Sequence, residues 1–276
     1  MRAEQIAARL WPDRELEIEP LGGGITNHNF VVRVDGQAYV LRIAGADTEL
    51  LGIDRAAEHE AARIAAGLGV GPEVVDFVEG SLITRFVGGG IVPVDEIRRP
   101  GCLREVAGLL RRIHDGPPFP AAFDAFRVVE AYRDTAEAHG VRIPARYEEA
   151  KARADEIERS LGTRPAQPCH NDLLNANFIR SPSGIRIVDW EYAGMGDRFF
   201  DLANFSVNHE LSEAESDALL DAYFGEVTDE AREHLRVMRF MSDFREAMWG
   251  VVQQGISKLD FDYEDYASRH FERALS

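Results

Sequence analysis

The sequence of 276 residues has few cysteines, a deficit of positive charge and no long apolar run. Its two cysteines, Cys102 and Cys169, are far apart and lack metal-ligand spacing, so neither a disulfide framework nor a zinc site is indicated. No segment approaches the apolar length of a membrane span, and residues 1–5 do not begin the apolar core of a signal peptide. We therefore expect a cytoplasmic protein that makes no membrane contact.

The charge is strongly acidic, with 48 Asp and Glu against 31 Lys and Arg and a net charge of −17. Such a protein repels nucleic acid and anionic lipid, and it suits a cationic small molecule. A hydrophobic content of 45% with 29% charged residues is typical of a globular enzyme, and the length allows one large domain or two lobes. We expect a small-molecule substrate and no nucleic-acid partner, and a homodimer is also allowed.

Acidic and amide side chains occur at informative spacings in the second half of the chain. Asp172 lies two residues after His170 and five before Asn177, and Asp189 follows the apolar, strand-like residues 185–188. Kinase-type phosphoryl transfer needs one Asp near the attacking hydroxyl and an Asn and an Asp on the metal ions, because positioning and charge neutralisation supply most of the rate.

Each of these residues taken singly could be a turn former, but the order and the preceding strands favour chemistry. The pattern indicates direct phosphoryl transfer from ATP. We predict Asp172 and Asn177 as catalytic residues, with Asp172 also contacting the substrate hydroxyl, and Asn177 and Asp189 as ligands of Mg²⁺. His170 is expected to hold this loop.

Roughly the first ninety residues have strand-like patterns and the remainder mostly helical ones. Expected strands cover residues 16–21, 30–34, 38–43, 74–78 and 82–87, and expected helices cover residues 53–68, 94–114, 127–139 and 144–161. The run Gly88–Gly90 is the best candidate for a flexible joint. We therefore expect an α+β, bilobal protein-kinase-like fold, with a small N-lobe of antiparallel sheet plus helix (residues 1–87) and a larger, mainly helical C-lobe (residues 88–276).

A glycine-rich segment, Gly22–Asn27, lies between the first two expected strands. Glycine lets backbone amides approach phosphate oxygens closely. The candidate ATP contacts here are Gly23, Gly24, Thr26 and Asn27, although a loop of this kind also occurs as a plain hairpin turn.

Arg42 is a cation within an apolar strand, so it needs a partner if it points inward. Glu58 is the first candidate and Glu60 the second, and the alternative is an Arg42 that faces solvent. We expect Arg42, held by its partner, to contact the phosphates of ATP, and the adenine to lie against the segment that contains Thr84 and Phe86.

Several motifs extend along the chain: Gly22–Asn27, Leu41–Ile43, Asp54–Glu58, Asp172–Asn177, Asp189–Tyr192, Phe200–Asn204, Trp249–Gln254 and Asp262–Ala267. With these motifs the sequence resembles the choline and ethanolamine kinase family, within the wider kinase-like group that includes the aminoglycoside phosphotransferases. The resemblance implies ATP and Mg²⁺ as cofactors, a cleft between two lobes as the ATP site, Glu58 as the partner of Arg42, and Asp201 as a support of the catalytic loop.

The aromatic residues near the C-terminus suit an ammonium substrate, because aromatic faces attract cations. Trp249, Tyr192 and Tyr263 are the candidates for an aromatic cage, with Glu191 and Glu246 as nearby acids. A plain core position on a long helix is the alternative for Trp249.

Two positions depart from the family pattern. Glu246 stands where a second aromatic residue is expected, three residues before Trp249, and Asn208 stands where an acid is expected, seven residues after Asp201. We expect choline or ethanolamine as the substrate. An aminoglycoside, thiamine or a sugar remains open as the acceptor, and so does a nucleotide-binding protein without catalysis.

Overall fold

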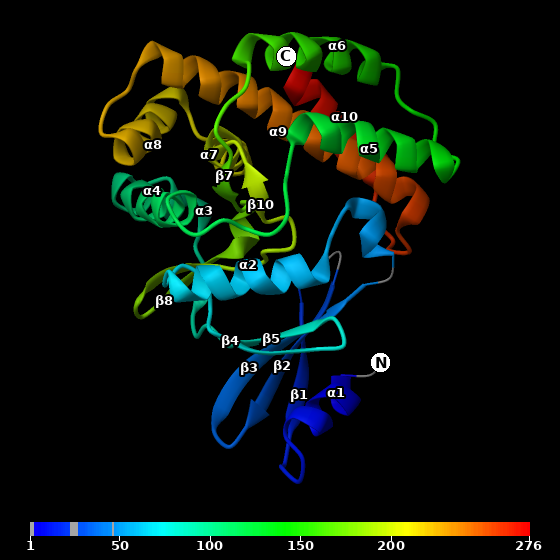
Figure 1. The fold of residues 1–276 in the computed structure, drawn as a ribbon, viewed down its shortest axis with the longest axis vertical. Helices are drawn as coiled ribbons and strands as arrows, with labels where there is room; N and C mark the ends of the chain where they lie inside the picture. Colours follow the sequence, from blue (N-terminus) through cyan, green and yellow to red (C-terminus); the bar gives the residue numbers. More distant parts are fainter. Residues whose placement is uncertain (1–2, 23–26, 46) are drawn as a thin grey trace. The chain divides into compact units, whose positions relative to one another are not determined.

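The computed structural model describes residues 3–22, 27–45 and 47–276 (Figure 1). Contacts divide the chain into two compact units, made of residues 1–92 with 176–191 and of residues 93–175 with 192–276. An antiparallel sheet dominates the first unit and helices dominate the second, which confirms the predicted α+β class.

A five-stranded antiparallel sheet of order β1-β2-β3-β5-β4 forms the body of the first unit, and a smaller sheet has the order β6-β8-β9. The strands are β1 (Glu17–Leu21), β2 (Asn27–Val34), β3 (Gln37–Ala44), β4 (Val74–Val78), β5 (Ser81–Arg85), β6 (Gly90–Ile91), β8 (Phe178–Ser181) and β9 (Gly184–Ile187). The helices are α1 (Ala3–Leu10) and α2 (Arg55–Gly67), with a 3-10 turn, η1 (Thr48–Leu51). Asp35 and Gly36 make the predicted β2–β3 turn, both with positive φ, as in a tight two-residue hairpin.

The two faces of the large sheet differ because adjacent residues on a strand point to opposite sides. Leu41 of β3 joins the apolar core with Val32 and Ile83, on the face where Ile6 of α1 packs. Helix α1 was absent from the elements expected from the sequence. Arg42, the next residue, points to the other face and reaches Glu58 of α2. The sheet therefore has one apolar face closed by α1 and one face that carries charge.

The glycine run of residues 88–90 belongs to the smaller sheet. Gly90 pairs with Arg180, and Ile91 pairs with Ile179 of β8. Strand pairing therefore holds the end of this run, where its composition led us to expect a flexible joint. Residue 88, where the C-lobe was expected to begin, lies inside the first unit. Gly89 has a φ of +146°, and a Cβ there would lie 1.7 Å from the carbonyl oxygen of Arg180.

Gly89→Ala is therefore expected to lower the free energy of unfolding of the first unit by roughly 2 kcal/mol or more, since it adds backbone strain to a steric clash. Gly88→Ala is the matched control, because a Cβ at Gly88 meets no described atom within 4 Å. Urea unfolding of the two variants measures the difference. Equal midpoints would contradict the close approach of Gly89 to β8.

The second unit is organised around a 28-residue helix, α9 (Asp229–Ile256), which packs against α5, α7 and α10. Most of its residues are buried, so this helix forms the centre of the unit (Figure 1). The other elements are α3 (Val94–Ile97), α4 (Pro100–His114), α5 (Ala125–Ala138), α6 (Arg146–Leu161), β7 (Gln167–Cys169), β10 (Gly194–Gly196), α7 (Arg198–Asn208), α8 (Glu213–Phe224) and α10 (Tyr263–Leu275). A 3-10 turn, η2 (Asn175–Asn177), precedes β8. Across the described parts of the chain, no helix is both long and apolar enough to cross a bilayer.

Candidate active site

Arg42 lies at the centre of a buried group of charges in the first unit. Its Nη1 donates to Glu58 Oε1 at 2.8 Å, and its Nη2 donates to Asp189 Oδ1. Glu60, the alternative partner, pairs instead with Arg63 at 2.9 Å on the exposed side of α2. Because only 10% of the Arg42 side chain is exposed, these carboxylates compensate a cation that would otherwise be costly to bury.

Arg55, at the start of α2, is a second cation in this group. It donates to Glu58 at 2.7 Å, to Glu191 at 3.1 Å and to the side-chain oxygen of Asn27 at 2.9 Å. Asn27 in turn donates to Glu191 at 2.8 Å. Burial by itself lowers the pKa of Arg42, but the three carboxylates around it outweigh that effect and raise the pKa above its ordinary value. The Arg42 guanidinium therefore stays charged.

Two residues with predicted roles take part in these contacts. Glu191 was expected beside an ammonium substrate, but its carboxylate is held by Arg55 and Asn27. Asn27 was expected as an ATP contact, and its side chain supports Glu191 and Arg55. The neighbouring candidates Gly23, Gly24 and Thr26 lie outside the described residues.

The two predicted metal ligands meet at one end of the β8–β9 hairpin. Asn177 directly precedes β8 and Asp189 follows β9, and the Val188 amide donates to the Asn177 carbonyl at 3.0 Å. Asp189 has a φ of +71°, an uncommon conformation for a residue other than glycine. Its side chain is 27% exposed. Amide and carboxylate oxygens are the ligands that Mg²⁺ prefers, so this pair of residues fits the ion.

The segment expected to receive adenine continues from the charged face of the sheet. Thr84 pairs with Val40, two residues before Arg42, and therefore lies on the same face as Arg42. Beyond the strand, the Phe86 amide donates to the Ala38 carbonyl at 3.0 Å. Thr84 thus lies on the same sheet face as Arg42, the predicted phosphate contact.

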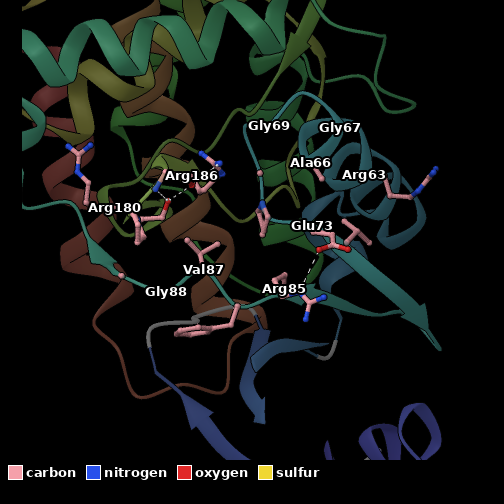
Figure 2. Close-up of a pocket in the computed structure, with 18 residues that line it drawn as sticks. Arg63, Ala66, Gly67, Gly69, Glu73, Arg85, Val87, Gly88, Arg180 and Arg186 are labelled. Carbon is pink, nitrogen blue, oxygen red and sulfur yellow. Dashed lines mark hydrogen bonds and ion pairs between the residues drawn. The ribbon is translucent and has the colours of Figure 1, made fainter. Parts of the chain in front are cut away.

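Figure 2 shows a pocket of about 1320 Å³ within the first unit. Phe86 and Arg186 are among the residues that line it, whereas Arg42, Asn177 and Asp189 are not among its described lining residues. The pocket therefore does not coincide with the predicted metal ligands or with Arg42.

Asp201 of α7 holds the loop that carries Asp172. Its Oδ2 accepts the His170 amide at 2.8 Å and its Oδ1 accepts the Asn171 amide at 2.7 Å. Asn171 has a φ of +66°, which turns the chain immediately before Asp172. These contacts agree with the supporting role that the family resemblance implies for Asp201.

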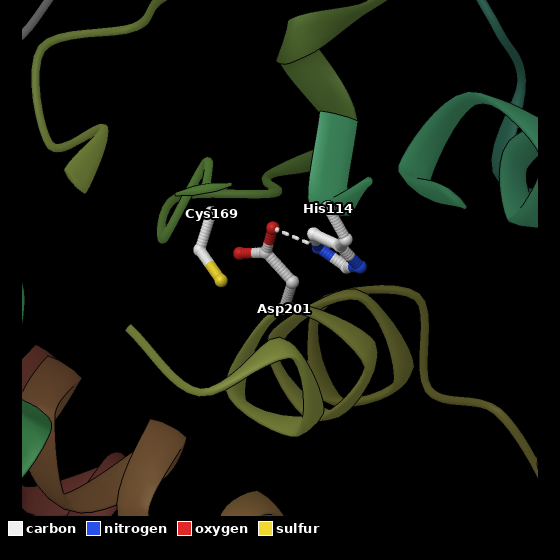
Figure 3. Close-up of side chains that lie close together, drawn as sticks. All are labelled: His114, Cys169 and Asp201. Atoms are coloured by element: carbon white, nitrogen blue, oxygen red, sulfur yellow. Dashed lines mark hydrogen bonds and ion pairs between the residues drawn. The ribbon is translucent and has the colours of Figure 1, made fainter. Parts of the chain in front are cut away.

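Asp201 also lies beside His114 and Cys169 in a buried group whose ligand atoms are all within 4.8 Å of one another (Figure 3). Both Asp201 oxygens already accept backbone amides, and His114 Nε2 is 3.0 Å from Oδ2. Burial, followed by the nearby Asp201, raises the pKa of the Cys169 thiol well above its ordinary value, which makes it a poor metal ligand. The group therefore serves to fix the loop that carries Asp172.

The side chain of Asp172 lies near a buried ion pair on α9. Arg245 Nη1 is 3.4 Å from Asp172 Oδ1 and also donates to Glu246 Oε1. The second Glu246 oxygen accepts the Tyr266 hydroxyl at 2.8 Å. Glu246, predicted as a substrate contact, is thus bound on both oxygens by the chain itself.

The predicted aromatic residues are in contact in the second unit. Trp249 packs edge-to-face against Tyr263, with ring centroids 5.9 Å apart, and its Nε1 donates to the Tyr192 hydroxyl at 3.2 Å. Tyr266 lies 5.6 Å from Trp249 and extends the group. The Arg245 guanidinium lies 4.3 Å from the centre of the Tyr192 ring, so one aromatic face already has a cation over it.

A model of the phosphotransferase enzyme family matches residues 17–239. The chain belongs to this family. The phosphotransferase is also 30% identical to a solved choline/ethanolamine kinase family protein from Mesorhizobium loti, with a TM-score of 0.83 over 100% of this chain and 94% of that one. It is therefore a member of the choline/ethanolamine kinase family, and the fold expected from the resemblance is confirmed.

Two curated relatives agree with this assignment. The phosphotransferase is 27% identical to protein LicA of Haemophilus influenzae, over 92% of this chain and 77% of that protein. It is 26% identical to ethanolamine kinase 1 of Mus musculus, over 95% of this chain and 84% of that protein.

Sequence reasoning missed two residues that this geometry makes prominent. Arg55 was visible only as part of the Asp54–Glu58 motif, although a cation three residues before Glu58 on a helix is a recognisable pairing signal. Arg245 stands within the buried stretch of α9, and a cation in such a stretch requires a partner. That signal could have revealed it.

Proposed function

We propose that this phosphotransferase transfers the γ-phosphoryl group of ATP to the hydroxyl of a small cationic alcohol, most directly choline or ethanolamine. The observation that carries the proposal is the meeting of Asn177 and Asp189 at one end of the β8–β9 hairpin, with Arg42 bound to Asp189. Hard oxygen ligands beside a permanently charged guanidinium suit a magnesium-bound triphosphate.

Each predicted residue has a defined task in this reaction. Asn177 and Asp189 hold Mg²⁺, which neutralises charge on the phosphates when it is bound. Arg42, kept in place by Glu58, binds phosphate oxygens. Asp172 accepts the proton of the acceptor hydroxyl and aligns it for in-line attack. Thr84 and Phe86 contact the adenine.

The acceptor is proposed from charge and aromatic content. The protein carries a net charge of −17, and Trp249, Tyr263 and Tyr266 form a ring group in the second unit. A cation over an aromatic ring gains about 0.5–2 kcal/mol. The relatives named above include an ethanolamine kinase and a choline/ethanolamine kinase family protein, which supports an amino alcohol of this size.

The test is ADP release from ATP by the purified protein, with and without Mg²⁺, in the presence of choline, ethanolamine, thiamine, an aminoglycoside or a simple sugar. We expect choline or ethanolamine to raise the rate at least about tenfold above the acceptor-free rate, only with Mg²⁺. A larger response to another acceptor would keep the chemistry and replace the substrate. ATP binding without transfer to any acceptor would contradict the proposal.

A further inference from the structure

A row of polar groups on α9 and α10, buried except for the half-buried Tyr266, ends at Asp172. Tyr266 donates to Glu246 at 2.8 Å, Glu246 binds Arg245, and Arg245 Nη1 lies 3.4 Å from Asp172 Oδ1. Arg245 is only 1% exposed and Glu246 only 3%. All of these residues belong to the second unit, so their contacts are those of one compact body.

The ion pair is costly to bury and therefore calls for an explanation. Removing a guanidinium and a carboxylate from water costs several kcal/mol per ion, and well-packed apolar residues often give equal or greater stability. Burial lowers the pKa of Arg245, but the neighbouring groups, with the Glu246 carboxylate first, together outweigh burial and hold the pKa well above its ordinary value. Arg245 is therefore a permanent cation beside the proposed catalytic carboxylate.

The two carboxylates beside Arg245 differ in how closely they contact it. Glu246 makes the closer contact with Arg245 Nη1, and Asp172 makes the longer one with the same nitrogen. A guanidinium bound mainly to Asp172 would weaken the Asp172 carboxylate as a proton acceptor. A guanidinium anchored on Glu246 can orient the Asp172 carboxylate with less loss of its basicity. The Tyr192 ring, 4.3 Å from the Arg245 guanidinium, packs on the cation from another side.

We propose that Arg245, anchored by Glu246 and Tyr266, is a positioning residue that orients the Asp172 carboxylate toward the acceptor hydroxyl. Since a carboxylate is planar, a contact to Oδ1 fixes the direction of the whole group. The proposal rests on the function proposed above. It gives a role to Glu246, which stands where the family pattern has an aromatic residue, and to its neighbour Arg245.

The kinetic test compares Arg245→Met with Arg245→Lys, using the acceptor that the unmodified protein phosphorylates fastest. We expect Arg245→Met to lower kcat by about tenfold to a hundredfold, because small misplacements of a reacting group have effects of this size. The KM for the acceptor and the Kd for ATP should change less than about threefold, since the contacts described for Arg245 are with Asp172, Glu246 and the Tyr192 ring. Arg245→Lys should recover most of the lost kcat.

Arg245→Met leaves Glu246 buried without its counter-ion, so misfolding could imitate the expected loss. The double variant Arg245→Met/Glu246→Gln removes both charges and serves as the folding control, checked by its Tm. We expect it to fold and still to have a lowered kcat. A folded double variant with full kcat, or a change confined to KM, would overturn the proposal.

A second measurement does not depend on the acceptor. If Arg245 contacts Asp172, the change in Tm caused by Asp172→Asn should differ by a few degrees between the unmodified protein and the Arg245→Met/Glu246→Gln protein. If the two changes in Tm are equal within about a degree, the substitutions act additively, and the contact between Arg245 and Asp172 would be overturned. Failure to find any acceptor, with non-additive changes present, would instead count against the proposed function and leave the positioning contact intact.

Discussion

Asp172→Asn is expected to lower kcat by about 10²–10⁴-fold, the range typical for loss of a general base. Asparagine has nearly the same shape and can still accept a hydrogen bond, but it cannot take the proton of the acceptor hydroxyl. Asp201 fixes the preceding loop through the His170 and Asn171 amides, so the backbone should stay in place. The Kd for ATP should therefore remain within about twofold of the original.

Initial-rate kinetics with the best acceptor, together with ATP binding by calorimetry, measure these two quantities. Asp229→Asn is the control, because Asp229 is exposed at the start of α9 and pairs only with Arg232 among the contacts described for it. A folded Asp172→Asn protein that keeps most of its kcat would remove Asp172 from the mechanism and transfer the role of proton acceptor to another group.

Glu58→Gln is expected to lower the free energy of unfolding of the first unit by about 3 kcal/mol, as is typical when one partner of a buried ion pair is removed. Glu58 is 3% exposed and binds both Arg42 and Arg55. The amide that replaces it carries no charge, so both cations depend on the remaining carboxylates, and Arg42 is drawn further toward Asp189. We expect the affinity for Mg²⁺ with ATP to fall as well.

Glu60→Gln provides a matched control two residues away on the same helix. Glu60 pairs with Arg63, and both side chains are about half exposed, so its loss should cost less than about 1 kcal/mol. Hydrogen exchange of the β3 and α2 amides measures the stability of this unit separately. Similar losses of stability in the Glu58→Gln and Glu60→Gln variants would show that the buried contacts of Arg42 contribute little to the stability of the first unit.

Local sequence was sufficient for several elements of the fold and the site. The Asp35–Gly36 turn, the strands around it and helix α2 follow from residue propensity and periodicity, which act over a few residues. The order of Asn177 and Asp189 and the strand expected before Asp189 predicted two metal ligands, and the β8–β9 hairpin brings the two residues to one end. Arg42 required a carboxylate, and the structure supplies Glu58.

Other features depended on packing between distant segments. The run Gly88–Gly90 has the composition of a flexible linker, but Gly90 pairs with β8 and Gly89 lies against the Arg180 carbonyl. Glycine is needed there for close approach. Glu191 follows Trp190 in a motif that pointed to the substrate, yet Arg55, 136 residues earlier in the chain, binds its carboxylate.

The sequence by itself determined the α+β class and the family, and it predicted the phosphoryl-transfer residues, because these depend on local propensity and on the spacing of chemical groups. Only the tertiary structure decided which carboxylates serve Arg42, Arg55 and Arg245, since a buried charge finds its partner through contacts between residues far apart in the chain. The cost of burying an unpaired charge makes those contacts specific, and no pattern within a short segment reports them.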